Sequence, residues 1–189
     1  MNESFKKVRF IASAPSISSF MGDYKPAVLM VGRSNVGKST LINGLLGQKV
    51  AFSSKKAGKT KSLNFFLVDD SFYLIDSPGY GSTNFATMST VQFSGLMEEA
   101  LPSRLVRAIC LLLDLRREPG KDDIAFIRYL ETFGKPIVVV LTKTDQMNQS
   151  ALAKAKAIAK NLGFEKVLLS DAKGSTRDKI RQAISSALH

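Results

Sequence analysis

The chain is poor in the side chains that most often perform acid–base and redox chemistry. Its only cysteine is Cys110, which excludes an intramolecular disulfide, and its only histidine is the last residue, His189. Histidine-based catalytic triads, His-rich zinc sites and a histidine general base inside the domain are therefore excluded. Apolar runs are short, and none approaches the roughly 18 residues that a membrane-spanning helix needs. We therefore expect no membrane span.

Positive charge, by contrast, is in excess. Lysine and arginine together number 27 against 16 acidic residues, which gives a formal net charge of +11. Such a charge favours a polyanionic partner such as RNA, DNA, phosphates or an anionic membrane surface. The basic N-terminal segment lacks the apolar stretch of a signal peptide, so we expect a cytoplasmic protein.

The order of apolar segments predicts the fold class. Residues 1–27 are rich in serine and broken by proline and glycine, and we interpret them as an extended arm packed on a domain of residues 28–189. In that domain we expect strands at residues 28–31, 63–68, 72–75, 106–113, 136–141 and 166–169, and helices at residues 38–46, 88–100, 122–133, 150–162 and 175–188. Apolar strands that alternate with helices indicate an α/β fold with a mostly parallel sheet covered on both faces.

A phosphate-binding loop, called the P-loop below, follows the first of these strands. Its sequence fits G-x-x-x-x-G-K-[ST] and reads Gly32-Arg33-Ser34-Asn35-Val36-Gly37-Lys38-Ser39. The glycines let backbone N–H groups turn toward a phosphate, which the helix N-terminus also attracts. We expect Lys38 to lie on the terminal phosphates, the Ser39 hydroxyl to ligate Mg²⁺, and Thr40 to belong to the same nucleotide-binding segment.

Two further segments fit the γ-phosphate and the metal ion. Asp76 begins Asp76-Ser77-Pro78-Gly79 at the end of a strand, where it can hold Mg²⁺ through water while the Gly79 N–H contacts the γ-phosphate. Gly58-Lys59-Thr60 lies in a basic loop, where Thr60 can reach Mg²⁺ and the γ-phosphate only when that phosphate is present. The alternative is that each segment is an ordinary turn or loop.

The segment Thr142-Lys143-Thr144-Asp145, called the base loop below, predicts the identity of the base. The Asp145 carboxylate can accept hydrogen bonds from guanine N1–H and N2–H₂, whereas adenine would leave it unpaired. The Lys143 stem can pack along the base. The alternative role for Asp145 is a helix N-cap. After the last strand, Ser170-Asp171-Ala172 completes a base pocket through backbone N–H groups.

In combination these segments resemble Ras-type GTPase domains, and more narrowly the EngB-type bacterial ribosome-assembly GTPases. The resemblance covers nearly the whole chain and includes the segments starting at Phe10, Leu63 and Asp114 besides those above. It implies a Ras-like P-loop GTPase fold with six strands, one antiparallel edge strand and five helices. It also implies GTP-dependent assembly of the large ribosomal subunit, with that subunit and its rRNA as partners. Two positions differ from the family: Ser77 stands where the family often has an apolar residue, and no tryptophan-containing stretch follows Gly81.

The expected chemistry is GTP hydrolysis with Lys38, Gly79, Thr60 and Asn35 at the phosphates. Tyr80 follows Gly79 where Ras-type enzymes place a water-orienting glutamine, so we expect slow intrinsic hydrolysis, on the order of 10⁻⁴ to 10⁻² s⁻¹. In GTPases that resemble this chain, an asparagine at the place of Asn35 supports a K⁺ ion. The alternative for Asn35 is a hydrogen bond that holds the loop in shape.

Other functions stay open at this point. Arg116 and Arg117 can contact a partner's RNA or form salt bridges with Asp122 and Asp123. The charge predicts RNA binding with a steep salt dependence and without sequence readout of RNA or DNA, and we expect a monomer. A GTP-gated RNA-binding module with negligible hydrolysis is the main alternative, and a P-loop kinase for a small molecule is the second.

Overall fold

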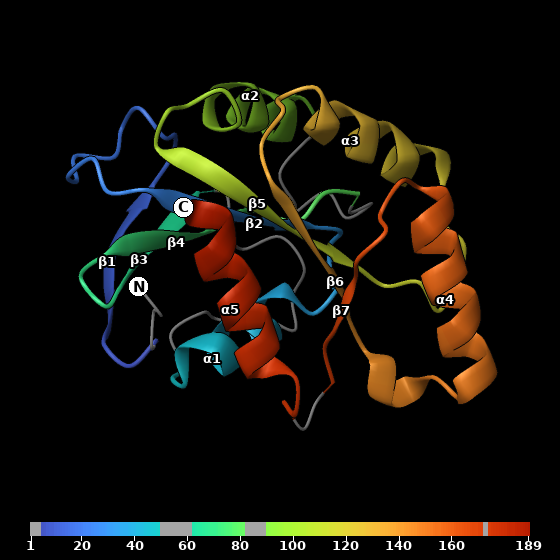
Figure 1. The fold of residues 1–189 in the computed structure, drawn as a ribbon. Helices are drawn as coiled ribbons and strands as arrows, with labels where there is room; N and C mark the ends of the chain where they lie inside the picture. Colours follow the sequence, from blue (N-terminus) through green and yellow to red (C-terminus); the bar gives the residue numbers. More distant parts are fainter. Residues whose placement is uncertain (1–4, 50–61, 82–89, 172–173) are drawn as a thin grey trace.

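The computed structural model describes residues 5–49, 62–81, 90–171 and 174–189. Strands and helices alternate along most of the chain (Figure 1). The strands are β1 (Val8–Ala14), β2 (Ala27–Gly32), β3 (Leu63–Val68), β4 (Phe72–Asp76), β5 (Val106–Leu113), β6 (Ile137–Leu141) and β7 (Leu168–Leu169). The helices are α1 (Lys38–Leu46), α2 (Thr90–Ala100), α3 (Lys121–Glu131), α4 (Gln149–Asn161) and α5 (Arg177–Leu188), with a 3₁₀ turn η1 (Thr144–Gln146) before α4.

All seven strands form one sheet in the order β1-β3-β4-β2-β5-β6-β7. Only β3 runs against the others, because it pairs antiparallel with both β1 and β4 while the remaining pairs are parallel. The α/β fold class with a mostly parallel sheet is confirmed. The expected count of six strands is wrong, and β3 is not at the edge, because Val8–Ala14 of the arm adds a seventh strand beside it. That strand buries only its two end residues, so it carries no apolar pattern to predict it from.

The arm is fixed to the sheet by polar and aromatic contacts. The Asp69 carboxylate, in the turn between β3 and β4, accepts the backbone N–H groups of Phe5, Lys6 and Lys7 at 2.7, 2.9 and 2.9 Å. Phe20 stacks on Phe65 with ring centroids 3.8 Å apart. These contacts join the start and the end of the arm to the same two strands.

The helices cover both faces of the sheet (Figure 1). Apolar residues of α2, α3 and α4 pack on one face, and those of α1 and α5 pack on the other. The central strands are buried on both sides, as expected for parallel strands between two helical layers. Cys110 lies in the second layer, where it is fully buried in the core and burial raises its thiol pKa to about 12. Among the described residues, no helix has the length and apolar content to cross a bilayer.

The fold brings the functional segments to one edge. Strands β3 and β4 form a hairpin that turns at Asp69 and Asp70, and both residues take the positive φ angles, 50° and 53°, of a tight hairpin turn. Strands β2, β4, β5, β6 and β7 are parallel, so their carboxyl ends share one edge of the sheet. That edge is where ligands bind in open α/β sheets.

We expect Asp69→Asn to lower the free energy of unfolding by about 1–2 kcal/mol, because an amide oxygen accepts three N–H groups more weakly than a carboxylate. Asparagine also tolerates the left-handed backbone at this position, so the substitution removes the charge and one of the two acceptor oxygens without straining the turn. Urea denaturation measures the change. Asp178→Asn, whose side chain is 93% exposed on α5, is the control and should change stability by less than about 1 kcal/mol. Equal midpoints for both variants would contradict the role of Asp69.

Candidate functional site

The P-loop joins β2 to α1 with the geometry of an anion site. Gly37 (φ 105°) is the residue before α1, and it offers no side chain to cap the first N–H groups of the helix. The first turn of α1 also has no acidic residue. Uncapped helix N–H groups carry partial positive charge and attract a phosphate. The P-loop therefore suits the phosphates that its sequence predicts.

The segment that ends in Gly79 lies directly against the P-loop. The Ser34 N–H donates to the Tyr80 carbonyl at 2.8 Å, and the Tyr80 N–H donates to the Gly32 carbonyl at 3.2 Å. A Cβ atom added at Gly79 would lie 2.8 Å from Ser34 Cα and 2.9 Å from its backbone nitrogen. Only glycine allows the two segments to approach this closely. The P-loop and residues 76–80 thus form one unit.

Lys38 and Asp76 meet at the centre of this unit. Their side chains form an ion pair and are only 10% and 6% exposed. Strand pairing aligns Asp76 of β4 with Met30 of β2, and the P-loop that follows β2 leads to Lys38 at the start of α1. The hydroxyl of Ser77 is fully buried and donates to the Met30 carbonyl at 2.7 Å. The buried Ser77 hydroxyl therefore has a hydrogen-bond partner within the core.

The same residues suit Mg²⁺. This ion prefers oxygen ligands and is commonly held by a carboxylate, a hydroxyl and phosphates. The Asp76 carboxylate lies at the carboxyl end of β4, and Ser39 lies in the first turn of α1 beside Lys38. Thr60, Gly58 and Lys59 lie outside the described residues, so their roles stay predictions.

The base loop is fixed to the P-loop and to the last strand. The Thr142 hydroxyl, in a residue only 3% exposed, donates to the Val36 carbonyl at 2.7 Å. The Lys143 ammonium group donates to the Asn35 carbonyl at 2.8 Å. The backbone N–H of Thr144 donates to the Ser170 carbonyl at 3.2 Å. Three segments predicted from separate motifs are therefore in direct contact.

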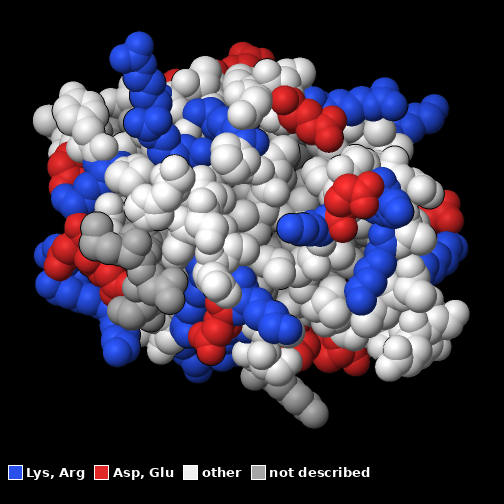
Figure 2. Space-filling model, viewed as in Figure 1, with Lys and Arg blue, Asp and Glu red and all other residues white. Residues whose placement is uncertain are grey.

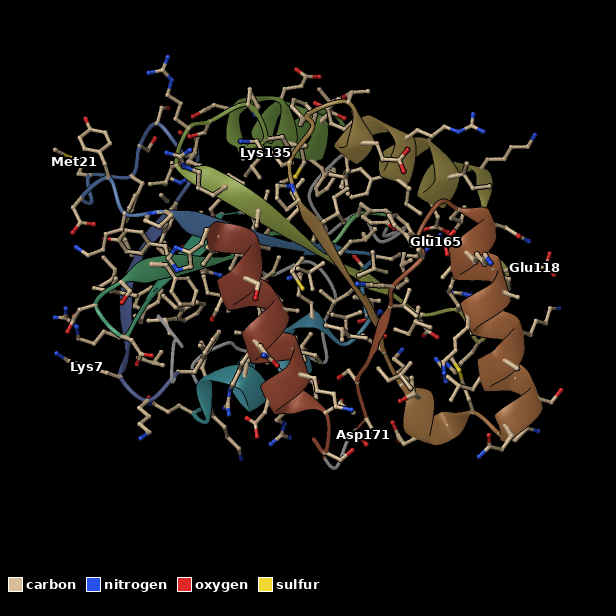
Figure 3. The ribbon with its side chains drawn as sticks, in the orientation of Figure 1. Lys7, Met21, Glu118, Lys135, Glu165 and Asp171 are labelled. Carbon is tan, nitrogen blue, oxygen red and sulfur yellow. The ribbon has the colours of Figure 1, made fainter. Side chains whose placement is uncertain are left out.

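Asp145 and Asp171 directly follow Thr144 and Ser170, which these contacts join. Asp145 is exposed within η1, and the N-cap of α4 is Asn148, so the alternative of an N-cap at Asp145 is wrong. Figure 3 places Asp171 where the chain passes from β7 toward α5. Hydrogen bonds from the Ser175 hydroxyl (2.6 Å) and from backbone N–H groups lower the pKa of Asp171 and fix its carboxylate within that turn. Ala172 lies outside the described residues.

Tyr80 faces the protein interior. It is 7% exposed and packs against Phe93 and Phe126, with ring centroids 6.1 and 4.6 Å away. Burial, the nearby charge of Asp123 and a hydrogen bond to that carboxylate raise the pKa of Tyr80. The phenol therefore belongs to the packing of α2 and α3 on the sheet.

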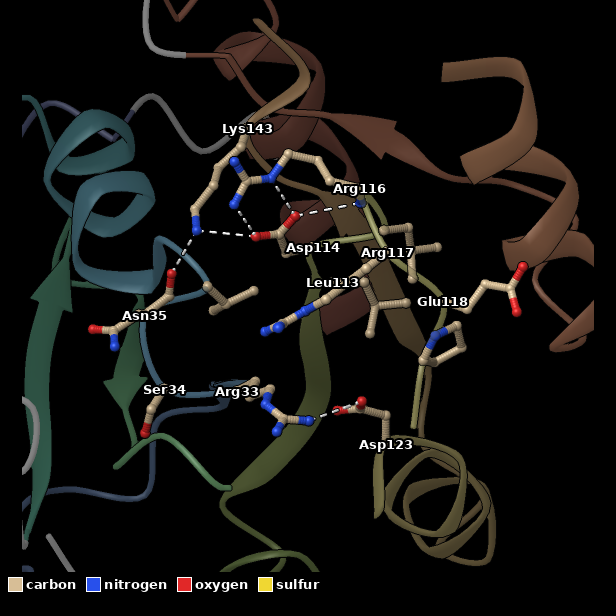
Figure 4. Close-up of a pocket in the computed structure, with 13 residues that line it drawn as sticks. Arg33, Ser34, Asn35, Leu113, Asp114, Arg116, Arg117, Glu118, Asp123 and Lys143 are labelled. Atoms are coloured by element: carbon tan, nitrogen blue, oxygen red, sulfur yellow. Dashed lines mark hydrogen bonds and ion pairs between the residues drawn. The ribbon is translucent and has the colours of Figure 1, made fainter. Parts of the chain in front are cut away.

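A cleft of about 350 Å³ lies between the P-loop and the segment that follows β5 (Figure 4). Its walls are residues 33–36 of the P-loop, residues 113–119 after β5, and two side chains, Asp123 and Lys143. Ion pairs lie at both ends: Arg33 contacts Asp123 at 3.1 Å, and Arg116 contacts Asp114 at 2.8 Å. The expected pairing of Arg116 with Asp122 or Asp123 is therefore wrong. The sequence feature that could have indicated Asp114 as a site residue is its position directly after a buried strand, at the edge where the other motifs lie.

Fold and site together define the class of P-loop GTPases. The family model described as "50S ribosome-binding GTPase" matches residues 27–143. A crystal structure of a probable GTP-binding protein engB has a TM-score of 0.66 at 22% identity, and the match covers 86% of this chain and 98% of that one. A structure of Era in complex with MgGDPNP and nucleotides 1506–1542 of 16S ribosomal RNA has a TM-score of 0.67 at 28% identity, covering 87% of this chain and 57% of that one.

Curated relatives narrow the assignment. The probable GTP-binding protein EngB of Solibacter usitatus is 39% identical over 184 residues, which is 96% of both chains. The EngB protein of Geobacillus kaustophilus is 34% identical over 186 residues, which is 95% of both chains. The chain belongs to the EngB family of GTP-binding proteins. This membership sets aside the small-molecule kinase that the P-loop alone left open.

We expect Gly79→Ala to weaken GDP binding by at least about tenfold, because the added Cβ would displace the P-loop backbone at Ser34. Titration with a fluorescent GDP analogue measures the affinity. Gly95→Ala is the matched control: its Cβ would meet nothing within 4 Å on α2, so affinity should be unchanged and stability should rise by about 0.5–1 kcal/mol. Wild-type affinity in Gly79→Ala would show that the close approach is not needed.

Proposed function

We propose that this protein is a GTP-binding switch that hydrolyses GTP slowly and acts in the cytoplasm in assembly of the large ribosomal subunit. The observation that carries the proposal is the direct contact of the P-loop with both the Asp76–Gly79 segment and the base loop. A guanine nucleotide needs all three segments at once: one for its phosphates, one for Mg²⁺ and the γ-phosphate, and one for its base.

Each group has a defined task in this mechanism. Lys38 and the P-loop N–H groups neutralise the charge that develops on the phosphates, and Ser39, Asp76 and Thr60 would hold Mg²⁺. When bound there, Mg²⁺ would supply positive charge that offsets the negative charge of the terminal phosphates. Asn35 is proposed to support a K⁺ ion beside the phosphates. Its backbone has a positive φ of 64°, and its side chain points away from Lys143 in Figure 4.

Slow hydrolysis is supported by the placement of Tyr80. This residue takes the place of the water-orienting glutamine of Ras-type enzymes, and its ring packs between α2 and α3 instead of reaching a nucleotide. Without a group to orient water, a rate on the order of 10⁻⁴ to 10⁻² s⁻¹ is expected. A partner that supplies the missing group would then control the lifetime of the GTP-bound state.

An RNA-containing partner is supported by two observations. The net charge is +11, and the related Era structure holds a fragment of 16S ribosomal RNA. On the face drawn in Figure 2, Lys and Arg side chains lie mostly toward the rim, with Asp and Glu among them. Such a distribution fits attraction to phosphates in general, without readout of a base sequence.

Asp145→Asn should convert the preference from guanine to xanthine nucleotides, because an amide donates to the xanthine O2 where the carboxylate accepted from the guanine N2 amino group. We expect GDP affinity to fall about 10²- to 10⁴-fold by calorimetry, with a gain in XDP affinity. Asp178→Asn, on the exposed surface of α5, should bind GDP like the wild type. If the wild type ignores GDP, or if Asp145→Asn shows no shift to XDP, the proposed base site is wrong.

Binding to purified large ribosomal subunits should depend on the nucleotide and on salt. We expect a difference of about fivefold or more between GDP and a non-hydrolysable GTP analogue in a sucrose-cushion pelleting assay, and a steep loss of binding between 50 and 200 mM KCl. Small subunits are the control. Equal binding with both nucleotides would contradict the switch. GTP turnover that does not rise with subunits would favour the module with negligible hydrolysis.

A further inference from the structure

Asp114 is a half-buried charge beside the site that has no part in the mechanism above. It directly follows β5, and its side chain is 16% exposed. Its carboxylate accepts Nε and Nη2 of Arg116, both at 2.8 Å, and also accepts Nζ of Lys143 at 3.0 Å (Figure 4). A carboxylate with two cationic partners at these distances makes charge-assisted hydrogen bonds, which are the strong ones.

These contacts fix residues on both sides of Asp145, which is the residue proposed to bind the base. Lys143 lies immediately before Thr144 and Asp145, and Gln146 lies immediately after them. Arg116, held by Asp114, donates to the side-chain oxygen of Gln146. One carboxylate therefore acts on both flanks of Asp145, directly on one side and through Arg116 on the other.

The backbone at this place needs such support. Lys143 has φ 57°, and Asn35, whose carbonyl accepts the Lys143 ammonium group, has φ 64°. Left-handed backbone is costly for residues other than glycine, and it persists only when surrounding contacts fix it. Asp114 is one of the two partners that the Lys143 ammonium group contacts among the described residues, and it is the charged one.

Asp114 keeps its charge over the whole physiological range. Burial opposes its ionisation, but the hydrogen bonds from Arg116 and Lys143 outweigh burial and lower its pKa to about 2. The hydrogen bond and charge of Asp114, with a weaker effect of Asp145, raise the pKa of Arg116. The Asp145 carboxylate is thus within electrostatic reach of Arg116.

We propose that Asp114 is a positioning residue for guanine recognition. It holds Lys143 on the P-loop carbonyl of Asn35 and, through Arg116, holds Gln146, so that Asp145 presents its carboxylate to the base and the base loop moves together with the P-loop. The inference rests on the proposed function, because it assigns a role within the same nucleotide site. An ordinary surface ion pair would contribute little and would not affect which base is bound.

The test compares Asp114→Asn with Asp122→Asn, an exposed acidic residue in the first turn of α3 that serves as the matched control. We expect Asp114→Asn to weaken GDP binding about 10- to 100-fold, as for the loss of a charge-assisted hydrogen bond. The ratio of GDP to IDP affinity should also fall, because inosine lacks the N2 amino group that a well-placed Asp145 recognises. Asp114→Glu should recover part of the GDP affinity and part of the ratio of GDP to IDP affinity. Asp122→Asn should match the wild type in both quantities.

Calorimetry with GDP and IDP measures both quantities, and thermal unfolding without nucleotide monitors the fold. If Asp114→Asn fails to fold, Arg116→Gln replaces it: this change removes the bridge to Gln146 and the hydrogen bonds that Arg116 donates to Asp114, but leaves the Asp114–Lys143 pair, and it should still lower the ratio of GDP to IDP affinity. An unchanged ratio in a folded variant, while the wild type binds GDP, overturns the positioning role and leaves the proposed function intact. A wild type that does not bind GDP overturns both.

Discussion

The parallel pairing of β2 with its neighbours β4 and β5 is the constraint on which the site depends. It brings the ends of these strands to one edge, where the P-loop, the segment after Asp76 and the residues after β5 begin. Backbone hydrogen bonds then join the loops to one another, as between Ser34 and Tyr80. A shift of one strand by a single residue would turn its side chains to the other face and separate these segments. The register of the sheet therefore also determines how the nucleotide-binding segments are arranged.

Around that edge, buried charges occur in pairs. Lys38 with Asp76, Arg33 with Asp123, and Asp114 with its two cations each combine a partly or fully buried carboxylate with a cation. Such pairs contribute less to net stability than to specific geometry, because desolvation offsets much of their attraction, while removal of one partner is costly. The Arg33–Asp123 pair links the P-loop to α3, and the Asp114–Lys143 pair links the end of β5 to the base loop. The charged groups at this edge of the sheet are thus fixed as separate pairs.

Much of the fold followed from local patterns. The helix at Lys38–Leu46 and the strands at Leu63–Val68 and Val106–Leu113 have the bounds expected from their apolar spacing. The strand expected at residues 166–169 is shorter, with only Leu168–Leu169 paired to β6. The arm strand Val8–Ala14 was not predicted, because it exposes most of its side chains and is held by backbone pairing and by the Asp69 carboxylate. Such contacts leave no hydrophobic period in the sequence.

The sequence by itself determined the class of chemistry, since the P-loop and the base loop carry their residue types at fixed spacing and in a fixed order. Tertiary structure decided which of these residues touch. Thr142 and Val36 are 106 positions apart, and Lys143 and Asn35 are 108 apart, yet both pairs are hydrogen-bonded. The partner of Arg116 and the interior place of Tyr80 were decided in the same way. Spacing along a chain encodes helix faces and strand faces, whereas the choice among ion-pair partners depends on distances that exist only after the sheet has formed.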